Sequence, residues 1–241
     1  MRLVCVGSSS KGNGYALIAE NEILLLEAGC RLIDVKKAIE WQISKVVGGL
    51  VSHAHLDHSA YIKEFMESGI PIYGGEGTQT DIEERGGERI KSLPLKAKTR
   101  IGEFIVQPFE LEHDCPCCGF LITHPEMGKL VFATDTEYVK YRFSNVNHIM
   151  IEANYSKEYL DDSKENAEKR KHVLYGHMSI ETASDFVIAH DSYDLQNVVL
   201  MHLSEHNGSP SEFKDKVSNL IDCRVEIAAP GLEIDLRKIP F

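Results

Sequence analysis

The stretch Val51-Ser52-His53-Ala54-His55-Leu56-Asp57-His58 constrains the fold of this chain more than any other part of the sequence. An apolar run typical of a buried strand precedes it, and apolar residues at helical spacing follow it. Residues two apart in a strand point to the same side, so His53 and His55 share one face, whereas Asp57 and His58 fall at a strand-to-helix corner. Imidazoles and a carboxylate at this spacing predict a metal site, because zinc and similar metals prefer these donors. A histidine-rich surface loop is the alternative interpretation.

The composition is that of an ordinary globular protein. The chain has 241 residues, of which 43% are hydrophobic and 26% are charged, and no repeat or composition break divides it. We therefore expect one domain over residues 1–241. No apolar run approaches the roughly 18 residues of a membrane span, and the first residues lack the features of a signal peptide. Six unevenly spaced cysteines do not suggest a disulfide scaffold, so we expect a reducing, cytoplasmic setting.

Hydrophobic periodicity predicts strands that occur in runs and helices that follow the strands carrying polar motifs. Strands are predicted at 2–6, 15–19, 22–26, 46–51, 71–73, 103–111, 119–123, 129–133, 148–151, 197–201, 223–228 and 232–237, and helices at 32–41, 59–68, 78–85, 156–171, 180–190 and 210–220. The first three strands would form an antiparallel meander, with Asn13 and Gly14 in a tight turn. We expect an α/β (α+β) fold in which two mixed sheets pack face to face with helices outside.

The charge distribution bears on the kind of partner. A net charge of −11 disfavours broad, non-specific attraction to nucleic acid. Residues 89–100, however, carry five basic residues and no acid, so Lys91 and Lys96 are candidate phosphate contacts, as is the run 164–172. The alternative, slightly favoured for 89–100, is a solvated sheet edge that Lys and Pro keep from pairing.

Potential metal ligands recur where predicted strands end. Strand ends along one rim of a sheet lie close together, so donors that are far apart in sequence can converge there. Seven such residues suffice for two metal ions. His113 and Asp135 could instead be ordinary turn residues, and His190 and His206 are rivals of His202. The strand-end donors are Glu27, His53, His55, Asp57, His58, His113, Asp135, Glu152, His177 and His202.

The segment from His53 to His58 matches the His-x-His-x-Asp-His signature of the metallo-β-lactamase superfamily, and the order of the downstream motifs matches as well. Within that superfamily the chain most resembles the YycJ/WalJ-type exonucleases. The segment Gly7-Ser8-Ser9-Ser10-Lys11-Gly12-Asn13 is similar to their opening loop, and His202-Leu203-Ser204-Glu205-His206-Asn207 is similar to their His-Leu-Ser-x-x-Asn segment. Ile151-Glu152-Ala153-Asn154 and Gly176-His177-Met178-Ser179 also resemble motifs of tRNase Z.

The resemblance implies an αββα sandwich with two divalent metal ions, zinc first and manganese second. It implies His53, His55 and His113 on the first ion, Asp57, His58 and His202 on the second, and Asp135 as the bridge. It further implies that Glu152 and His177 protonate the leaving group, while Asp57 orients the attacking hydroxide or takes its proton. Glu27 would fix a ligand imidazole such as His55, although the family usually has Asp at this position. Ser9, Ser204 and Asn207 are candidate substrate contacts.

The implied function is a metal-dependent hydrolase, and specifically a phosphodiesterase or exonuclease that cleaves DNA or RNA by attack of a metal-bridging hydroxide. One alternative is a small-molecule hydrolase of a cyclic phosphodiester, lactone or thioester. A binding module that has lost catalysis is another alternative, although such a module need not keep all seven ligands. Cys115-Pro116-Cys117-Cys118 is not part of the family pattern, and it could be a soft metal site, a redox-sensitive loop or a set of incidental thiols.

Overall fold

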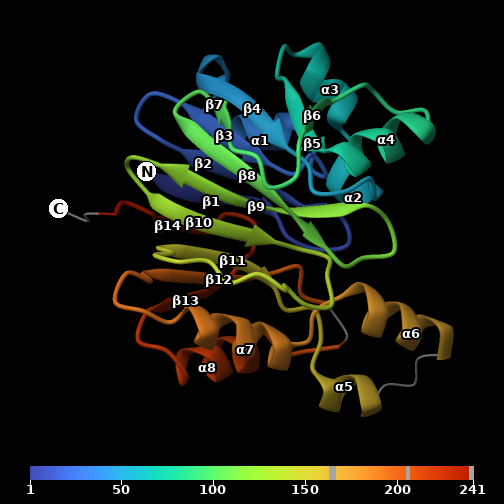
Figure 1. Ribbon diagram of the computed structural model, residues 1–241, viewed down its shortest axis with the longest axis vertical. Helices are drawn as coiled ribbons and strands as arrows, with labels where there is room; N and C mark the ends of the chain where they lie inside the picture. Colours follow the sequence, from blue (N-terminus) through green and yellow to red (C-terminus); the bar gives the residue numbers. More distant parts are fainter. Residues whose placement is uncertain (163–166, 205–206, 239–241) are drawn as a thin grey trace.

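A computed structural model describes residues 1–162, 167–204 and 207–238 as two stacked β-sheets with helices on both outer sides (Figure 1). Within these residues each sheet has seven strands. In order across the first sheet these are β14 (Glu233–Asp235), β1 (Arg2–Gly7), β2 (Gly14–Ile18), β3 (Ile23–Leu26), β4 (Val46–Leu50), β5 (Ile72–Gly75) and β6 (Lys91–Leu93). Across the second sheet they are β13 (Arg224–Ile227), β12 (Asn197–Met201), β11 (His148–Glu152), β10 (Gly128–Ala133), β9 (Cys117–His124), β8 (Phe104–Leu111) and β7 (Thr99–Ile101).

The central strands are apolar on both faces because both faces are covered. In β2, Tyr15 and Leu17 face the core between the sheets, whereas Ala16 and Ile18 face the outer helices. β12 repeats the pattern, with Val199 between the sheets and its neighbours against the helices of the second sheet. Continuous apolar runs are typical of strands buried in this way. The inter-sheet core and the two helix–sheet cores thus make the four layers of an αββα sandwich.

The helices that cover the sheets are short and amphipathic. Apolar residues of α1 (Leu32–Ala38), α3 (Ile62–Glu67) and α4 (Glu76–Glu84) pack on the first sheet, and those of α7 (Ile180–His190) and α8 (Pro210–Ser218) pack on the second. Each helix of the second pair begins at a serine whose hydroxyl accepts a backbone N–H of the first turn. The remaining helices are η1 (Ile43–Lys45), α2 (Leu56–Ser59), α5 (Lys157–Asp162) and α6 (Ala167–Gly176).

Strand direction gathers the loops of both sheets at one rim. β3, β4 and β5 are parallel in the first sheet, and β10, β11 and β12 are parallel in the second. β8 runs in the same direction as β10, because each pairs antiparallel with β9. The carboxyl ends of these strands carry the polar motifs of the sequence. The predicted convergence of strand ends therefore has its basis in the topology.

The predicted sandwich is confirmed, and the differences are local. The opening meander is present, because β1, β2 and β3 pair antiparallel in sequence order. β6 and β7 were missed, and each lies at an edge of its sheet, which agrees with the sheet-edge interpretation of residues 89–100. The prediction of a tight turn at Asn13 and Gly14 is wrong. In the loop between β1 and β2 only Gly12 has a positive φ, and the loop is wider than a tight turn because it contacts the segment 51–58. No helix in the described ranges is long and apolar enough to cross a membrane.

Candidate metal centre

The strand-end donors meet at the common rim of the two sheets. The segment that follows β4 brings His53, His55, Asp57 and His58 from the first sheet, and loops after β8, β10 and β12 bring donors from the second. The donor atoms form overlapping groups in which all ligand atoms lie within 4.8 Å of one another. The groups are His53, His55, His113 and Cys115; His53, His58 and Asp135; Asp57, His58 and His202; and Asp135, Glu152, His177 and His202.

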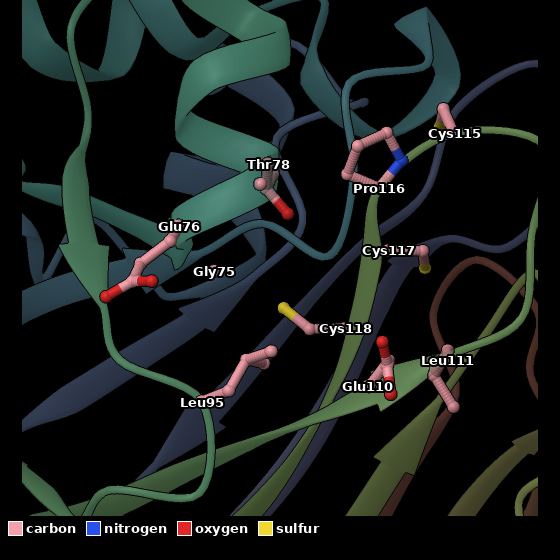
Figure 2. A pocket seen from close by; sticks show the side chains of 11 residues that line it. Gly75, Glu76, Thr78, Leu95, Glu110, Leu111, Cys115, Pro116, Cys117 and Cys118 are labelled. Atoms are coloured by element: carbon pink, nitrogen blue, oxygen red, sulfur yellow. The ribbon is translucent and has the colours of Figure 1, made fainter.

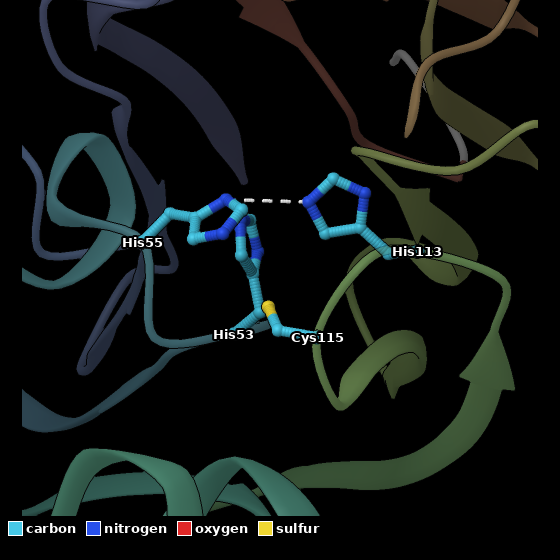
Figure 3. Close-up of side chains that lie close together, drawn as sticks. All are labelled: His53, His55, His113 and Cys115. Carbon is cyan, nitrogen blue, oxygen red and sulfur yellow. Dashed lines mark hydrogen bonds between the residues drawn. The ribbon is translucent and has the colours of Figure 1, made fainter. Parts of the chain in front are cut away.

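Three imidazoles converge on the first position. His113 Nδ1 lies 2.9 Å from the carbonyl oxygen of Gly176, so it donates and leaves the lone pair on Nε2. His113 Nε2 and His55 Nδ1 lie 3.3 Å apart and share a hydrogen bond (Figure 3). One oxygen of the Asp114 carboxylate lies 3.2 Å from His55 Nε2 and 3.3 Å from His113 Nε2. A hydrogen bond such as that from His113 to Gly176 fixes the tautomer and orientation of a metal-binding imidazole.

His53 completes this group. Its Nδ1 lies 2.9 Å from the hydroxyl of Ser52, and its ring is fully buried. Its Nε2 is buried without a hydrogen-bond partner. Burial lowers the pKa of His53 well below the usual value, and the neighbouring His58 lowers it further, so the ring is neutral. A neutral, buried imidazole with an unused lone pair is what a metal ligand requires.

The second position is built around Asp57 and His58, which lie in α2. His58 Nδ1 faces Glu27 Oε2 at 3.5 Å, and its Nε2 faces the carboxylates of Asp57 and Asp135 at 3.3 and 3.1 Å. His202 Nε2 approaches Asp57 at 3.2 Å. The sequence predicted that Glu27 would contact an imidazole such as His55, but Glu27 lies beside His58 instead. Glu27 follows β3 directly and also accepts the N–H of Ser52, which places its carboxylate there.

Three residues of the site have a backbone conformation that side chains other than glycine rarely adopt. Glu27, Asp135 and His202 have φ values of 63°, 50° and 54°, and each follows a strand that ends at the rim. Such conformations cost about 1–3 kcal/mol each and persist where surrounding contacts enforce them. At His202, the backbone N–H donates to the Ser8 hydroxyl, which itself accepts from Tyr15. The turn at each strand end directs the side chain into the cluster.

Glu152 connects the two histidines of the last group. Its Oε1 lies 2.6 Å from His177 Nδ1 and 3.1 Å from His202 Nδ1, so it accepts from both rings. Its Oε2 accepts the backbone N–H groups of Thr136 and Met178. The carboxylate is fully buried. Burial raises the pKa of Glu152, but the contacts with His177 and the other donors outweigh burial and lower it, so Glu152 is ionised.

The cluster concentrates buried negative charge. Burial raises the pKa values of Asp57 and Asp135, yet the neighbouring histidines outweigh burial and hold both values well below the usual range. Conversely, burial lowers the pKa of His202, and Asp135 with the other carboxylates raises it to about 10. In the polypeptide alone, protonated imidazoles supply the compensating positive charge. Divalent cations would supply the same charge and leave the rings neutral.

The residues present therefore fit a metal centre with two positions. Three observations support this fit: the unpartnered His53 Nε2, the lone pair on His113 Nε2, and the shared approach of Asp135 to His58 and His202. The donors are nitrogen and carboxylate oxygen, which suit zinc and do not exclude manganese.

The candidate substrate residues lie at different distances from this cluster. The loop that holds Ser9 contacts the site, since its Asn13 amide donates to Asp57. Ser204 N–H donates to the backbone of Asn154, whose side chain bonds the His202 carbonyl. Asn207 is buried, and its backbone oxygen accepts the N–H of Ser156.

The basic candidates lie elsewhere. Lys91 packs over the Tyr73 ring at the edge strand β6, and Lys96 lies over Tyr141. Of the run 164–172, residues 164–166 lie outside the described residues, as does the rival ligand His206. The other rival, His190, is structural, because its ring nitrogens bond Phe143 and Phe186.

Sequence reasoning missed two residues of the site. Asn13, interpreted as a turn residue, reaches Asp57 and lies 3.0 Å from His58 Nε2. The Asp114 carboxylate lies beside both His55 and His113, and only its position directly after His113 could have indicated this. For Cys115 a soft metal site was one of the open interpretations, and the structure places its thiol in the group of the first position.

Comparisons with known proteins agree with the fold described above. A family model described as a Beta-lactamase superfamily domain matches residues 33–203. The metallo-beta-lactamase fold protein YhfI from Bacillus subtilis superposes with a TM-score of 0.73 at 18% identity, covering 97% of this chain and 98% of that chain. The short form of human tRNase Z gives 0.65 at 16% identity, covering 98% and 99%. A diphosphatase from the PhnP family gives 0.67 at 12% identity, covering 97% of each chain. No curated protein matches the sequence.

Proposed function

Because this chain belongs to the beta-lactamase superfamily, we propose that it is a dinuclear-metal phosphodiesterase, with a nucleic-acid end as the preferred substrate. We assign His53, His55 and His113 to the first metal position, Asp57, His58 and His202 to the second, and Asp135 to both. Zinc is the proposed metal, with manganese as the alternative. Among nucleases, the resemblance of the opening loop and of the segment after His202 favours the YycJ/WalJ-type exonucleases.

The observation that carries the proposal is the Glu152–His177 pair beside the donor cluster. Glu152 accepts from His177 Nδ1 at 2.6 Å, so Nε2 is the nitrogen at which His177 can hold a proton for a substrate. Burial lowers the pKa of His177, but Glu152 outweighs it and raises the value above the usual range. A positioned imidazolium suits a reaction whose leaving group is an alkoxide, because that group must gain a proton as it departs. Hydrolysis of a phosphodiester within a nucleic acid is such a reaction.

Other side chains position the reactants. When bound, two divalent ions would lower the pKa of a water molecule and offset the charge on the phosphate oxygens. Asp57 orients the attacking water or accepts its proton, and Asn13, His58 and His202 hold the Asp57 carboxylate. Glu27 keeps the ring of His58 in place from the buried side.

The substrate strand would approach over the loops that surround the cluster. Ser9, Ser204 and Asn207 are proposed contacts, since their segments adjoin Asp57 and His202 through the hydrogen bonds described above. Lys91 and Lys96 are proposed only for a longer strand, because they pack on aromatic rings of the sheet-edge region.

A small-molecule hydrolase is the second candidate. The net charge of −11 favours it, since an acidic protein attracts an extended polyanion poorly. The similarity to a structure described as a diphosphatase points to the same class. The cluster would then act on a cyclic phosphodiester, a lactone or a thioester with the same residues.

Substrate assays on the metal-loaded protein separate these candidates. The panel contains 5′-labelled DNA and RNA, a chromogenic phosphodiester, a cyclic phosphodiester, a lactone and a thioester, with Asp57→Ala as the inactive control. Shortening of labelled nucleic acid by the wild type and not by the variant is the expected result. Turnover of the lactone alone would refute the nuclease proposal, and loss of all activity at full metal loading would favour a binding module.

A further inference from the structure

The thiol of Cys115 lies at the first metal position. Cys115 follows His113 by two residues, on the loop between β8 and β9. Its Sγ and one nitrogen of each of His53, His55 and His113 all lie within 4.8 Å of one another. Figure 3 shows the side chain of Cys115 directed toward the three rings. The group at this position therefore contains a soft donor in addition to the imidazoles.

A second observation points to a ligand at the same place. His53 belongs to the same group as the thiol, and its Nε2 is buried and has no hydrogen-bond partner. The hydrogen bond from His113 Nδ1 to Gly176 leaves the His113 lone pair on Nε2, which lies 3.3 Å from His55 Nδ1. A buried, unused nitrogen is costly unless a ligand occupies it. The four atoms together match the imidazole and thiolate donors that bind zinc.

The neighbouring thiols do not share this environment. Figure 2 shows Cys117 and Cys118 pointing to opposite sides of β9. Cys117 contacts the carbonyl of Thr134 and packs in the core of the second sheet, whereas Cys118 contacts the carbonyl of Ser52 in the inter-sheet core. Alternation along the strand explains the difference, since Cys115 precedes β9 and is free of its pleat.

We propose that Cys115 Sγ is an additional protein donor at the first metal position, a fifth beside the three imidazoles and Asp135, and this role rests on the metal centre proposed above. On binding, the thiol gives its proton to solvent and the thiolate coordinates the ion. A thiolate favours zinc over manganese, because manganese prefers oxygen donors. Cys115 thus makes the first position more selective than three imidazoles and a carboxylate alone.

Cobalt substitution tests the donor directly. Cobalt(II) bound by a thiolate gives a near-ultraviolet sulfur-to-metal charge-transfer band, which imidazole and carboxylate donors do not produce. The wild type loaded with cobalt should show this band, Cys115→Ser should lose it, and Cys223→Ser should keep it. Cys223 is the matched control, since it is a partly buried thiol on the far side of the second sheet, beside Arg224. A stoichiometric cobalt protein without the band, or a band that survives in Cys115→Ser, would overturn the inference.

Thiol alkylation tests the wild-type protein without any variant. Zinc at a hundredfold excess over its Kd leaves about 1% of the site empty, so iodoacetamide should modify Cys115 about a hundredfold more slowly than in the metal-free protein. Peptide mass spectrometry measures this rate against that of Cys223, which zinc should not change. Equal rates at Cys115 with and without zinc would contradict the inference even if Cys115→Ser failed to fold.

Neither measurement depends on turnover. A protein that shows the charge-transfer band and protects Cys115, yet hydrolyses no phosphodiester, would keep the inference and refute the proposed function. A protein that binds two metals and cleaves nucleic acid without involving the thiol would refute the inference about Cys115 and keep the proposed function.

Discussion

The carboxylate of Glu152 lies 2.6 Å from Nδ1 of His177, and the same oxygen also accepts from His202. One buried carboxylate therefore orients both the proposed proton donor and a proposed metal ligand. The two histidines come from different segments, one after α6 and one after β12. In the proposed mechanism, a change at Glu152 would therefore affect both proton transfer and metal binding.

Replacing His177 separates these two functions. His177→Ala should slow cleavage of a substrate with an alkoxide leaving group by about 10²–10⁴-fold, because general acid catalysis contributes this much. A nitrophenolate leaving group needs no proton, so its release should slow far less. Steady-state kinetics on the two substrates gives the ratio, and metal analysis should still find two ions per chain. Loss of one ion would instead make His177 a ligand.

Gly29 tests the packing beneath the second metal position. A Cβ at Gly29 would overlap the carbonyl of Asp57 and lie 2.8 Å from the backbone nitrogen of Asn13. Gly29→Ala should therefore displace α2 and reduce bound metal from two ions toward one, as measured by elemental analysis. Gly69→Ala is the control for backbone strain alone, since its Cβ meets open space and its positive φ costs about 1–2 kcal/mol. Full metal loading of Gly29→Ala would contradict the assignment of the second position.

Metal removal should destabilise the whole sandwich, because the proposed ligands come from both sheets. An ion present at a thousandfold excess over its Kd stabilises the folded state by about 4 kcal/mol. Chelation should therefore lower the midpoint of thermal unfolding by several degrees. Asp135→Asn, which weakens the shared donor, should respond much less to the chelator. An unchanged midpoint in the wild type would indicate that the donor cluster binds no ion.

His148 should make stability depend on pH away from the metal centre. Its Nε2 donates to the carbonyls of Met127 and Leu236, and its Nδ1 accepts from Asn197, so the ring is buried and neutral. Burial lowers the pKa of His148 to about 4. Since the unfolded chain binds this proton at a higher pH, stability is complete above pH 6.5 and declines toward pH 4, by up to about 3 kcal/mol.

A comparison of two proteins isolates that effect. Urea unfolding of the wild type and of His148→Gln at several pH values gives the difference in unfolding free energy, from which groups common to both proteins cancel. The unfolding free energy of the wild type should exceed that of His148→Gln by less and less as the pH falls from 6.5 to 4. A constant difference over this range would show that His148 does not titrate on unfolding.

The sequence predicted the architecture because its strands are apolar on both faces and its donors stand at strand ends. His53 and His202 are far apart in the chain, yet each follows a parallel strand, one in each sheet, and the strand pattern together with the superfamily resemblance placed them in one predicted cluster. Most predicted strands differ from the observed ones by a residue or two. The short edge strands β6 and β7 were not predicted, because three residues with a single buried side chain carry little periodic signal.

The contacts between loops could not be predicted in this way. The link from Asn13 to Asp57 depends on how the opening loop folds over α2, and Asn13 has the residue type of an ordinary turn. For Glu27, the sequence predicted a position at a strand end but could not predict the side chain that it contacts. That contact depends on the register between β3 and β4. Side-chain partners across a rim follow from three-dimensional packing, which spacing along the chain does not encode.

The position of β14 has a consequence for biosynthesis. β14 pairs with β1, so residues near position 235 complete a sheet that begins at residue 2. A nascent chain emerges from the ribosome with its histidine motif long before β12, and β14 follows later still. Partly translated polypeptides therefore contain the early imidazoles without His202 and without a complete first sheet. The full set of proposed ligands and the pairing of β1 with β14 come together only after residue 235 has left the ribosome.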